Sequence, residues 1–211
     1  LWAKSYDREL RDILALHSEV AQAIAGEVRA KLTPDERARL ASTRVVNPEA
    51  HEAYVKGRYW WNRRTAQTLQ RAIGYFQQAI EKDPGYALAW TGLADCYAVY
   101  SYYGVLSTED SMPRARQAAM RALAIDDTLA EAHASLAYVK RHYEWDWPGA
   151  EREFKRAIDL NPHYATAHQW YGTTLSGMGR LDEAMGELKR AQESDPLSPI
   201  IGAEVGRGFY Y

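Results

Sequence analysis

The sequence predicts an all-α, right-handed superhelical solenoid of helix–turn–helix repeats with an N-terminal helical extension. Three observations predict it. Apolar residues recur at helical spacing in successive segments. This pattern repeats with a period of about 34 residues, which is typical of paired-helix solenoids. A helix-ending residue closes each unit, at Pro84, Asp127, Pro162 and Pro196.

Composition narrows the class of protein. The chain has 211 residues, 46% hydrophobic and 26% charged, as in globular proteins. Its net charge of −2 gives no reason to expect nucleic acid or an anionic membrane as partner. Cys96 is the single cysteine, so an internal disulfide is excluded. We expect a cytoplasmic location, or a periplasmic one if a longer parent supplies an upstream membrane helix.

Residues 1–46 predict a separate N-terminal unit. The chain starts without Met, which we interpret as a piece of a longer protein. Thr33 and Pro34 read as the cap of a short second helix that runs to about Ala41. Before it, one apolar stripe predicts a long amphipathic helix from Asp7, through Leu10, Ile13, Leu14, His17, Val20, Ala21, Ile24, Val28 and Leu32.

Residues 47–211 predict the repeat array, and Asn47 with Pro48 predicts the start of its first helix. Small residues such as Gly172 and Ala184 mark places where two helices approach closely. The predicted repeats are 51–86, 87–129, 130–164 and 165–198, followed by a half repeat at 199–211.

The second repeat is longer than the others because of the segment Tyr100–Ser107. This segment is interpreted either as a binding loop or as an extension of the preceding helix. The spacing of Tyr97, Tyr100 and Gly104 favours the extension, with the glycine as its stop.

These units resemble the tetratricopeptide (TPR) repeat over residues 48–211. The residues that carry the resemblance include Tyr171, Gly172, Leu175, Ala184 and Leu188 in the fourth unit. His133 and His168 stand where Trp is common. The resemblance implies a scaffold that binds protein, and it implies no catalytic residues.

A second resemblance concerns the parent protein. The block from Leu1 to Leu16 is similar to the end of a TolB-like domain, which often precedes TPR arrays in large bacterial proteins. The segments Lys56–Thr65 and Tyr143–Trp147 are similar to repeat turns of the same family. Such parents carry a winged-helix, nucleotide cyclase or Ser/Thr kinase output domain, and residues 1–46 would then be the end of the TolB-like domain plus a connector.

No motif predicts an enzyme, a cofactor or a metal site. His133, His142, His163 and His168 lack the spacing and the partners of zinc ligands. His133 and His168 are therefore interpreted as packing residues. Cys96 lies on a helix without a neighbouring base, which favours an inert core thiol.

Recognition is expected on the concave face, which the first helices of the pairs line. Side chains turned away from each core stripe were selected at 100° per residue. Aromatic and Arg side chains among them are the types that dominate binding energy at interfaces. The predicted partner-binding residues are Lys56, Tyr59, Asn62, Thr91, Asp95, Tyr138, Arg141, His142, Gln169, Trp170 and Thr173.

The leading functional hypothesis is a protein-interaction scaffold or sensor module of a larger bacterial regulator. On this hypothesis, Trp170→Ala and Arg141→Ala would abolish binding without unfolding the chain. The alternative is a self-association module of a transcription regulator, cyclase or kinase. It would form a homodimer through the Leu10–Leu32 stripe or the open end at Phe209, Tyr210 and Tyr211.

Overall fold

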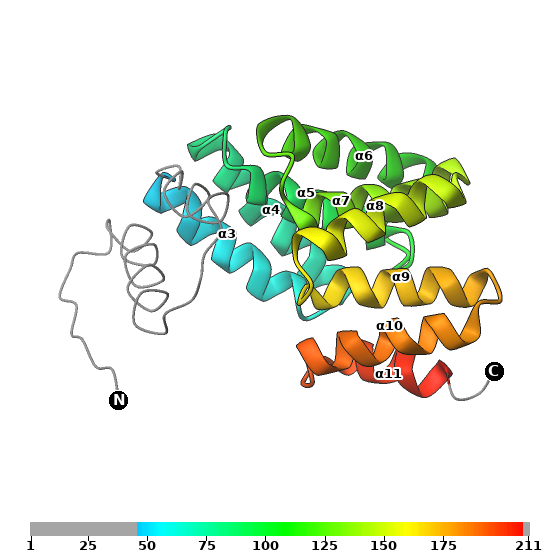
Figure 1. Cartoon of the computed structure of the whole chain (residues 1–211). Coiled ribbons are helices and arrows are strands. Elements are labelled where there is room, and N and C mark those ends of the chain that lie inside the picture. Colours follow the sequence, from blue (N-terminus) through cyan, green and yellow to red (C-terminus); the bar gives the residue numbers. More distant parts are fainter. Residues whose placement is uncertain (1–45, 209–211) are drawn as a thin grey trace, which may run out of the picture.

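The computed structural model describes residues 46–208, which fold into a curved stack of antiparallel helix pairs (Figure 1). Within this range there is no β-strand. Each pair is joined by a short turn, and each second helix leads into the first helix of the next pair. The first two pairs are α3 (Pro48–Trp61) with α4 (Ala66–Lys82) and α5 (Ala87–Tyr100) with α6 (Thr108–Ile125). The third pair consists of α7 (Ala130–Val139), extended by the π-helical turn η2 (Lys140–Glu144), and α8 (Trp147–Leu160). The fourth pair consists of α9 (Ala165–Gly177) and α10 (Leu181–Ser194), and α11 (Pro199–Gly208) follows it.

The all-α solenoid predicted from the sequence is confirmed. The long helix expected from Asp7 to Leu32, the Thr33 cap, the short helix to Ala41 and the TolB-like segment lie outside the described residues. So do Phe209, Tyr210 and Tyr211, and with them both surfaces of the expected homodimer.

Helix starts follow local capping chemistry. The Asn47 side-chain oxygen accepts hydrogen bonds from the amides of Glu49 (2.9 Å) and Ala50 (3.3 Å), as the sequence predicted. Thr65 and Thr68 form a reciprocal capping box at the start of α4. These bonds satisfy amide donors that a helix cannot pair internally.

The core of the first two pairs is built around Phe76, whose ring is fully buried. Gly57 in α3 and Gly92 in α5 face this ring from both sides, and a Cβ at either glycine would come within 3.0 Å of it. In the last pair, a Cβ on Gly172 would lie 2.8 Å from Leu188 and 3.1 Å from the Ala184 carbonyl oxygen. The close helix approach predicted at Gly172 and Ala184 is therefore confirmed.

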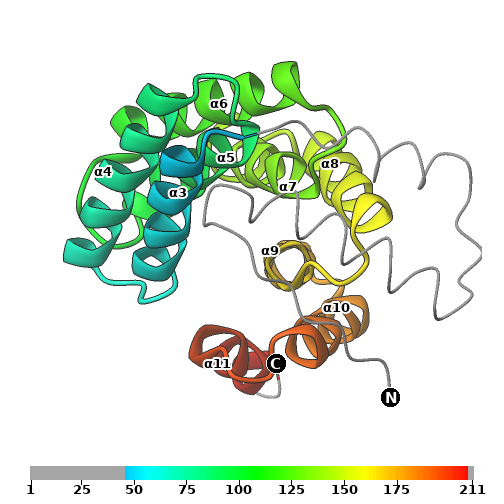
Figure 2. The ribbon, with the colours of Figure 1, turned by 90° about the vertical axis from the view of Figure 1, so that its left-hand side faces the viewer.

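The helix pairs follow an arc rather than a straight line (Figure 2). Contacts between the first helices of successive pairs, α3 with α5, α5 with α7 and α7 with α9, form its inner layer. The second helices α4, α6, α8 and α10 each pack against their own first helix. A side chain of a first helix that points away from its pair therefore often meets the next first helix instead of solvent.

The segment after α5 differs from the favoured expectation. The α-helix ends at Tyr100, and turns rather than helix occupy residues 101–104. Gly104 adopts a positive φ of +66°, which permits the stop. As a result Tyr102 projects into solvent with 74% of its side chain exposed.

A π-helical turn interrupts the third pair. In η2 the helix widens over Lys140–Glu144 and ends at Trp145, which has a left-handed φ of +55°. Such turns contain one residue more than the α-helix around them, and they occur often at functional sites. Arg141 and His142 lie in this turn.

His133 and His168 occupy equivalent places in the third and fourth pairs. His133 contacts the Glu153 carboxylate through Nδ1 (2.7 Å) and the Asp127 carbonyl oxygen through Nε2 (3.0 Å). His168 contacts Glu187 (2.6 Å) and the Pro162 carbonyl oxygen (2.9 Å) in the same way. Because both ring nitrogens face acceptors, the doubly protonated imidazolium satisfies both contacts and the neutral ring satisfies one.

This geometry makes stability depend on pH. The hydrogen bond to Glu153 raises the pKa of His133, and burial opposes that shift. Burial lowers the pKa of His168, but its bonds to Glu187 and Pro162 outweigh burial, so the net shift is upward. A raised folded pKa means that the stabilisation is complete below the unfolded value of about 6.5 and is lost as pH rises through the folded pKa.

We expect His133→Gln/His168→Gln to remove this dependence. Urea denaturation of the wild type should show decreasing free energy of unfolding as pH rises from about 6.5, and the double variant should show a flatter profile. The matched control is His163→Gln, an exposed loop histidine. Equal slopes for the wild type and the double variant would contradict the role of the two pairs.

Candidate functional site

A groove of about 680 Å³ in the described part of the chain opens to solvent. It extends from the α3–α4 turn, past the end of α5 and η2, to α9, α10 and α11. Its lining is mainly aromatic, aliphatic and cationic. Its lining includes Arg64, Tyr102, Tyr103, Tyr138, Arg141, His142, Gln169, Trp170, Thr173, Leu181, Ile200, Glu204 and Arg207.

Three rings contact one another along one wall of the groove, and we call them the ring stack. Tyr138 is stacked on His142, with ring centroids 4.1 Å apart, and packs at a tilt of 54° against Trp170, with centroids 4.7 Å apart. The rings come from α7, η2 and α9, so the stack joins the third and fourth pairs. Aromatic surfaces of this kind supply large contact area at low entropy cost when a partner binds.

Arg141 is held in place beside this stack. One guanidinium nitrogen lies 2.7 Å from His142 Nε2, and another donates to the Thr173 carbonyl oxygen at 3.2 Å. Thr173 belongs to the C-terminal half of α9, where carbonyl groups favour a cation. The guanidinium is therefore fixed before any partner arrives.

Burial controls the protonation of the groove. It lowers the pKa of His142 to about 4, and the nearby Arg141 charge adds to that shift. His142 is thus a neutral ring near pH 7, free to accept from Arg141. Burial also raises the pKa of Tyr138 to about 12, which keeps its hydroxyl protonated.

The groove brings together six of the eleven predicted partner-binding residues. The predicted residues of the first pair lie elsewhere, on the exposed surface of α3 and at its end. Lys56 forms an ion pair with Glu52 (2.6 Å), and Tyr59 is 53% exposed beside Arg63. Asn62 is the exposed C-cap residue of α3.

Thr91 and Asp95 require a correction, because the structure buries both. The Thr91 hydroxyl donates to the Ala87 carbonyl oxygen at 3.1 Å. The Asp95 carboxylate pairs with Arg58 (2.9 Å) and accepts from the Ser135 hydroxyl (2.5 Å). Asp95 contacts the neighbouring first helices α3 and α7, and Thr91 is buried, so neither is available to a partner.

Trp170 also requires a correction. It lines the groove, but only 4% of its side chain is exposed. Removing a ring this deeply buried costs about 3–5 kcal/mol of stability. This burial argues against the expectation that Trp170→Ala leaves folding nearly unchanged, and it makes this variant unsuitable as a test of binding.

Several groove residues were missed from the sequence. Arg64 and Arg207 lie outside the regions used for the prediction, in the first turn and on α11. Tyr102 and Tyr103 were considered only as part of the segment that follows α5. The aromatic run Tyr100–Tyr103 was the available signal, because exposed rings in a turn often serve recognition.

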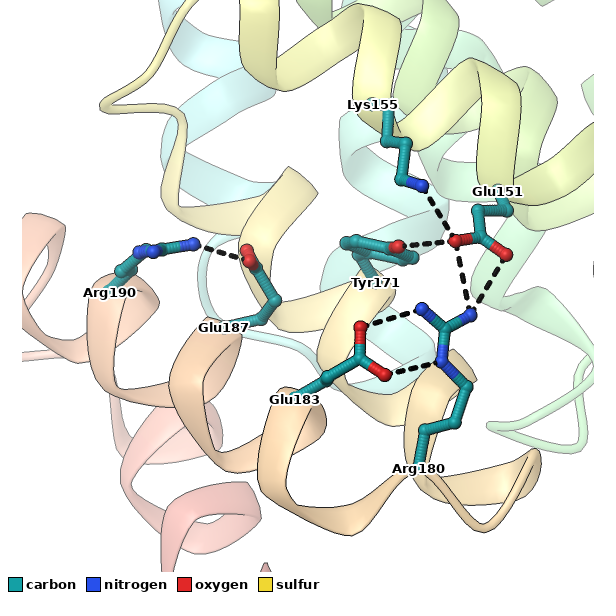
Figure 3. Close-up of polar contacts among 7 residues, drawn as sticks. All are labelled: Glu151, Lys155, Tyr171, Arg180, Glu183, Glu187 and Arg190. Carbon is teal, nitrogen blue, oxygen red and sulfur yellow. Dashed lines mark hydrogen bonds and ion pairs between the residues drawn. The ribbon is translucent and has the colours of Figure 1, made fainter.

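A second hollow, of about 380 Å³, lies between α8 and α10 on the other side of α9. Several charged side chains in and beside it pair with one another (Figure 3). Glu151 accepts from Tyr171 (2.9 Å) and pairs with Lys155 (2.8 Å) and Arg180 (3.0 Å). Lys155, then Tyr171 and Arg180, hold the pKa of Glu151 at about 2. We interpret this network as a clamp between repeats.

Among residues 46–208, no group of three or more His, Cys, Asp or Glu side chains is placed to hold a metal ion. Burial raises the pKa of the Cys96 thiol well above its usual value, which keeps it protonated. None of the described helices has the length and apolar character needed to cross a membrane.

Comparison with known proteins gives consistent matches. Models of the tetratricopeptide repeat match residues 61–99 and 144–203. The transcriptional regulator HilA of Salmonella typhimurium is 25% identical over 149 residues, which are 71% of this chain and 27% of HilA. Putative adenylate cyclase 3 of Rhizobium meliloti is 33% identical over 139 residues, 65% of this chain and 24% of that protein.

A solved structure shares the fold. The crystal structure of a thermophilic TPR protein from Thermus thermophilus superposes with a TM-score of 0.62 at 19% identity, covering 96% of this chain and all of that one. The chain spans about a quarter of the length of the curated relatives it matches.

Proposed function

Because this chain carries tetratricopeptide repeats, we propose that it is the protein-interaction module of a larger regulatory protein and that it binds a partner segment in the groove. TPR folds are typically non-catalytic scaffolds for protein binding. The relatives named as a transcriptional regulator and a putative adenylate cyclase support a regulatory parent, since the match in each covers only part of the protein.

One observation carries the proposal: the groove opens to solvent, and the rings of its aromatic wall already pack against one another. Tyr138, His142 and Trp170 hold one another in a stack, and Arg141 is pinned between η2 and α9. A partner therefore pays little for ordering these side chains, which is the condition for tight binding to a small area. Tyr102 and Tyr103 also line the groove.

Peptide selection tests the proposal. A random library of short displayed peptides is selected on the purified chain, and the affinities of the selected peptides are measured by calorimetry. We expect Tyr102→Ala to weaken binding by about tenfold, the usual effect of removing a central aromatic contact. Tyr102 is 74% exposed, so its removal leaves the core intact.

The matched control is Tyr59→Ala, another exposed tyrosine, which lies on α3 outside the groove. It should bind the selected peptides as the wild type does. Equal affinities for both variants, or a selection that yields no binding peptide, would contradict the proposal.

A further inference from the structure

We propose that the groove selects acidic peptide segments, whose carboxylates bind Arg64 and Arg141 while a neighbouring apolar side chain packs on the ring stack. This inference rests on the proposed function and adds the chemical class of the partner. It comes from the charges of the groove, which differ in sign from the net charge of −2 of the chain.

The groove is cationic. Arg64, Arg141 and Arg207 line it, and Glu204 is the acidic residue among its described lining. Glu204 and Arg207 are 3.4 Å apart and belong to one helix, α11. This pair neutralises one guanidinium, which leaves the charges of Arg64 and Arg141 facing the groove.

Neither of these two guanidinium groups has a carboxylate partner among residues 46–208. Arg64 lies flat against the Trp61 ring, with Cζ 3.5 Å from the ring centroid. Its backbone has a φ of +50°, a conformation that non-glycine residues adopt rarely. Arg141 is bonded to the neutral His142 and to the Thr173 carbonyl oxygen.

Burial removes water from the guanidinium groups of Arg64 and Arg141, and no carboxylate of the described residues replaces it. Burial lowers the pKa of Arg64 and of Arg141, so in each case the surroundings disfavour the charged form. The Asp95 carboxylate acts on Arg64 in the opposite direction, but it is already bound to Arg58 and Ser135. An incoming carboxylate would supply the missing counter-charge in a place where charge-assisted bonds are strong.

Both guanidinium groups line the same groove as Tyr138. Each of them lowers the pKa of the Tyr138 hydroxyl against the larger effect of burial. Tyr138 is also the central ring of the stack. A peptide whose acidic residue reaches Tyr138 therefore has aromatic surface beside it and the half-exposed Leu181 in the same groove.

The test compares acidic peptides with their neutral analogues. The selected peptides are synthesised with a C-terminal amide, so that only side-chain carboxylates carry negative charge, and again with each Glu or Asp changed to Gln or Asn. We expect the neutral analogues to bind about tenfold more weakly, the loss typical of one charge-assisted hydrogen bond. We also expect added salt to weaken the acidic peptides but not the neutral ones.

Protein variants locate the contact. Arg64→Gln and Arg141→Gln should each weaken the acidic peptide by about tenfold and leave the neutral analogue unchanged, whereas Arg64→Lys should retain part of the affinity. Arg63→Gln is the matched control, since Arg63 is exposed and stacks on Tyr59 outside the groove. Far-UV circular dichroism verifies that each variant folds. Arg207→Gln provides a further groove variant, at a side chain that is 58% exposed.

The outcomes separate the two proposals. If neutral and acidic peptides bind equally and Tyr102→Ala still weakens both, the groove binds peptides and the charge preference is wrong. Competition by a single-stranded oligodeoxynucleotide as strong as that by the acidic peptide would also overturn it, in favour of a general polyanion site. If Tyr102→Ala changes no affinity, the proposed function itself fails.

Discussion

Replacing Phe76 by Ala is expected to lower the free energy of unfolding by about 3–5 kcal/mol, the usual cost of removing a buried ring. Phe76 is fully buried, and Gly57 and Gly92 leave no side chain of their own to fill the space. The cavity would lie between α3, α4 and α5, at the junction of the first two pairs. Urea denaturation monitored by circular dichroism measures the change.

The matched control is Met120→Ala on α6, at a residue 48% exposed, which should change stability by about 0.5 kcal/mol or less. Gly92→Ala tests the same contact from the opposite side, because its Cβ would collide with the ring. Combining Gly92→Ala with Phe76→Leu should recover part of the stability that Gly92→Ala alone loses. A loss below about 1 kcal/mol for Phe76→Ala would contradict the central role of this ring.

Removing the buried carboxylate of Asp95 is expected to have an effect of similar size. Asp95 is fully buried and joins the first helices of three pairs, through Arg58 in α3 and Ser135 in α7. Burial raises its pKa, and the bonds to Arg58 and Ser135 oppose that shift. Asp95→Ala leaves the Arg58 charge without its partner, so we expect a loss of about 3–5 kcal/mol.

A double variant distinguishes the pair from simple loss of packing. In Arg58→Met/Asp95→Leu both charges are gone and apolar volume remains, so most of the stability should return. The measurement is a double-mutant cycle in urea. Additive losses, with no recovery in the double variant, would show that the ion pair is not what joins these helices.

The fold was predictable because each repeat carries its own local evidence. Asn47 predicts the start of a helix, and Gly172 predicts a close approach of two helices. The spacing of apolar residues identifies the core stripe of each helix. These features depend on residues near one another in the chain. The candidate site depends instead on how the pairs stack, since α3, α5, α7 and α9 contact one another along the inner layer.

The rule used for the partner-binding residues therefore succeeded in part of the array. The residues that this rule selects include Tyr138 and Arg141, which line the groove, but also Thr91 and Asp95, which are buried. The positions of Arg64 and Tyr102 depend on turns with positive φ at Arg64 and Gly104, which periodicity does not describe. Long-range stacking and turn geometry are the two kinds of information that the repeat pattern lacks.

Because of the π-helical turn η2, the number of residues between α7 and α8 affects which side chains face the groove. The turn holds one residue more than an α-helix would, and each residue turns a helix by about 100°. A relative that lacks one residue between α7 and α8 would present other side chains where Arg141 and His142 now lie. Relatives that share the preference of this groove should therefore be sought first by the spacing between these two helices, and only then by the identity of single residues.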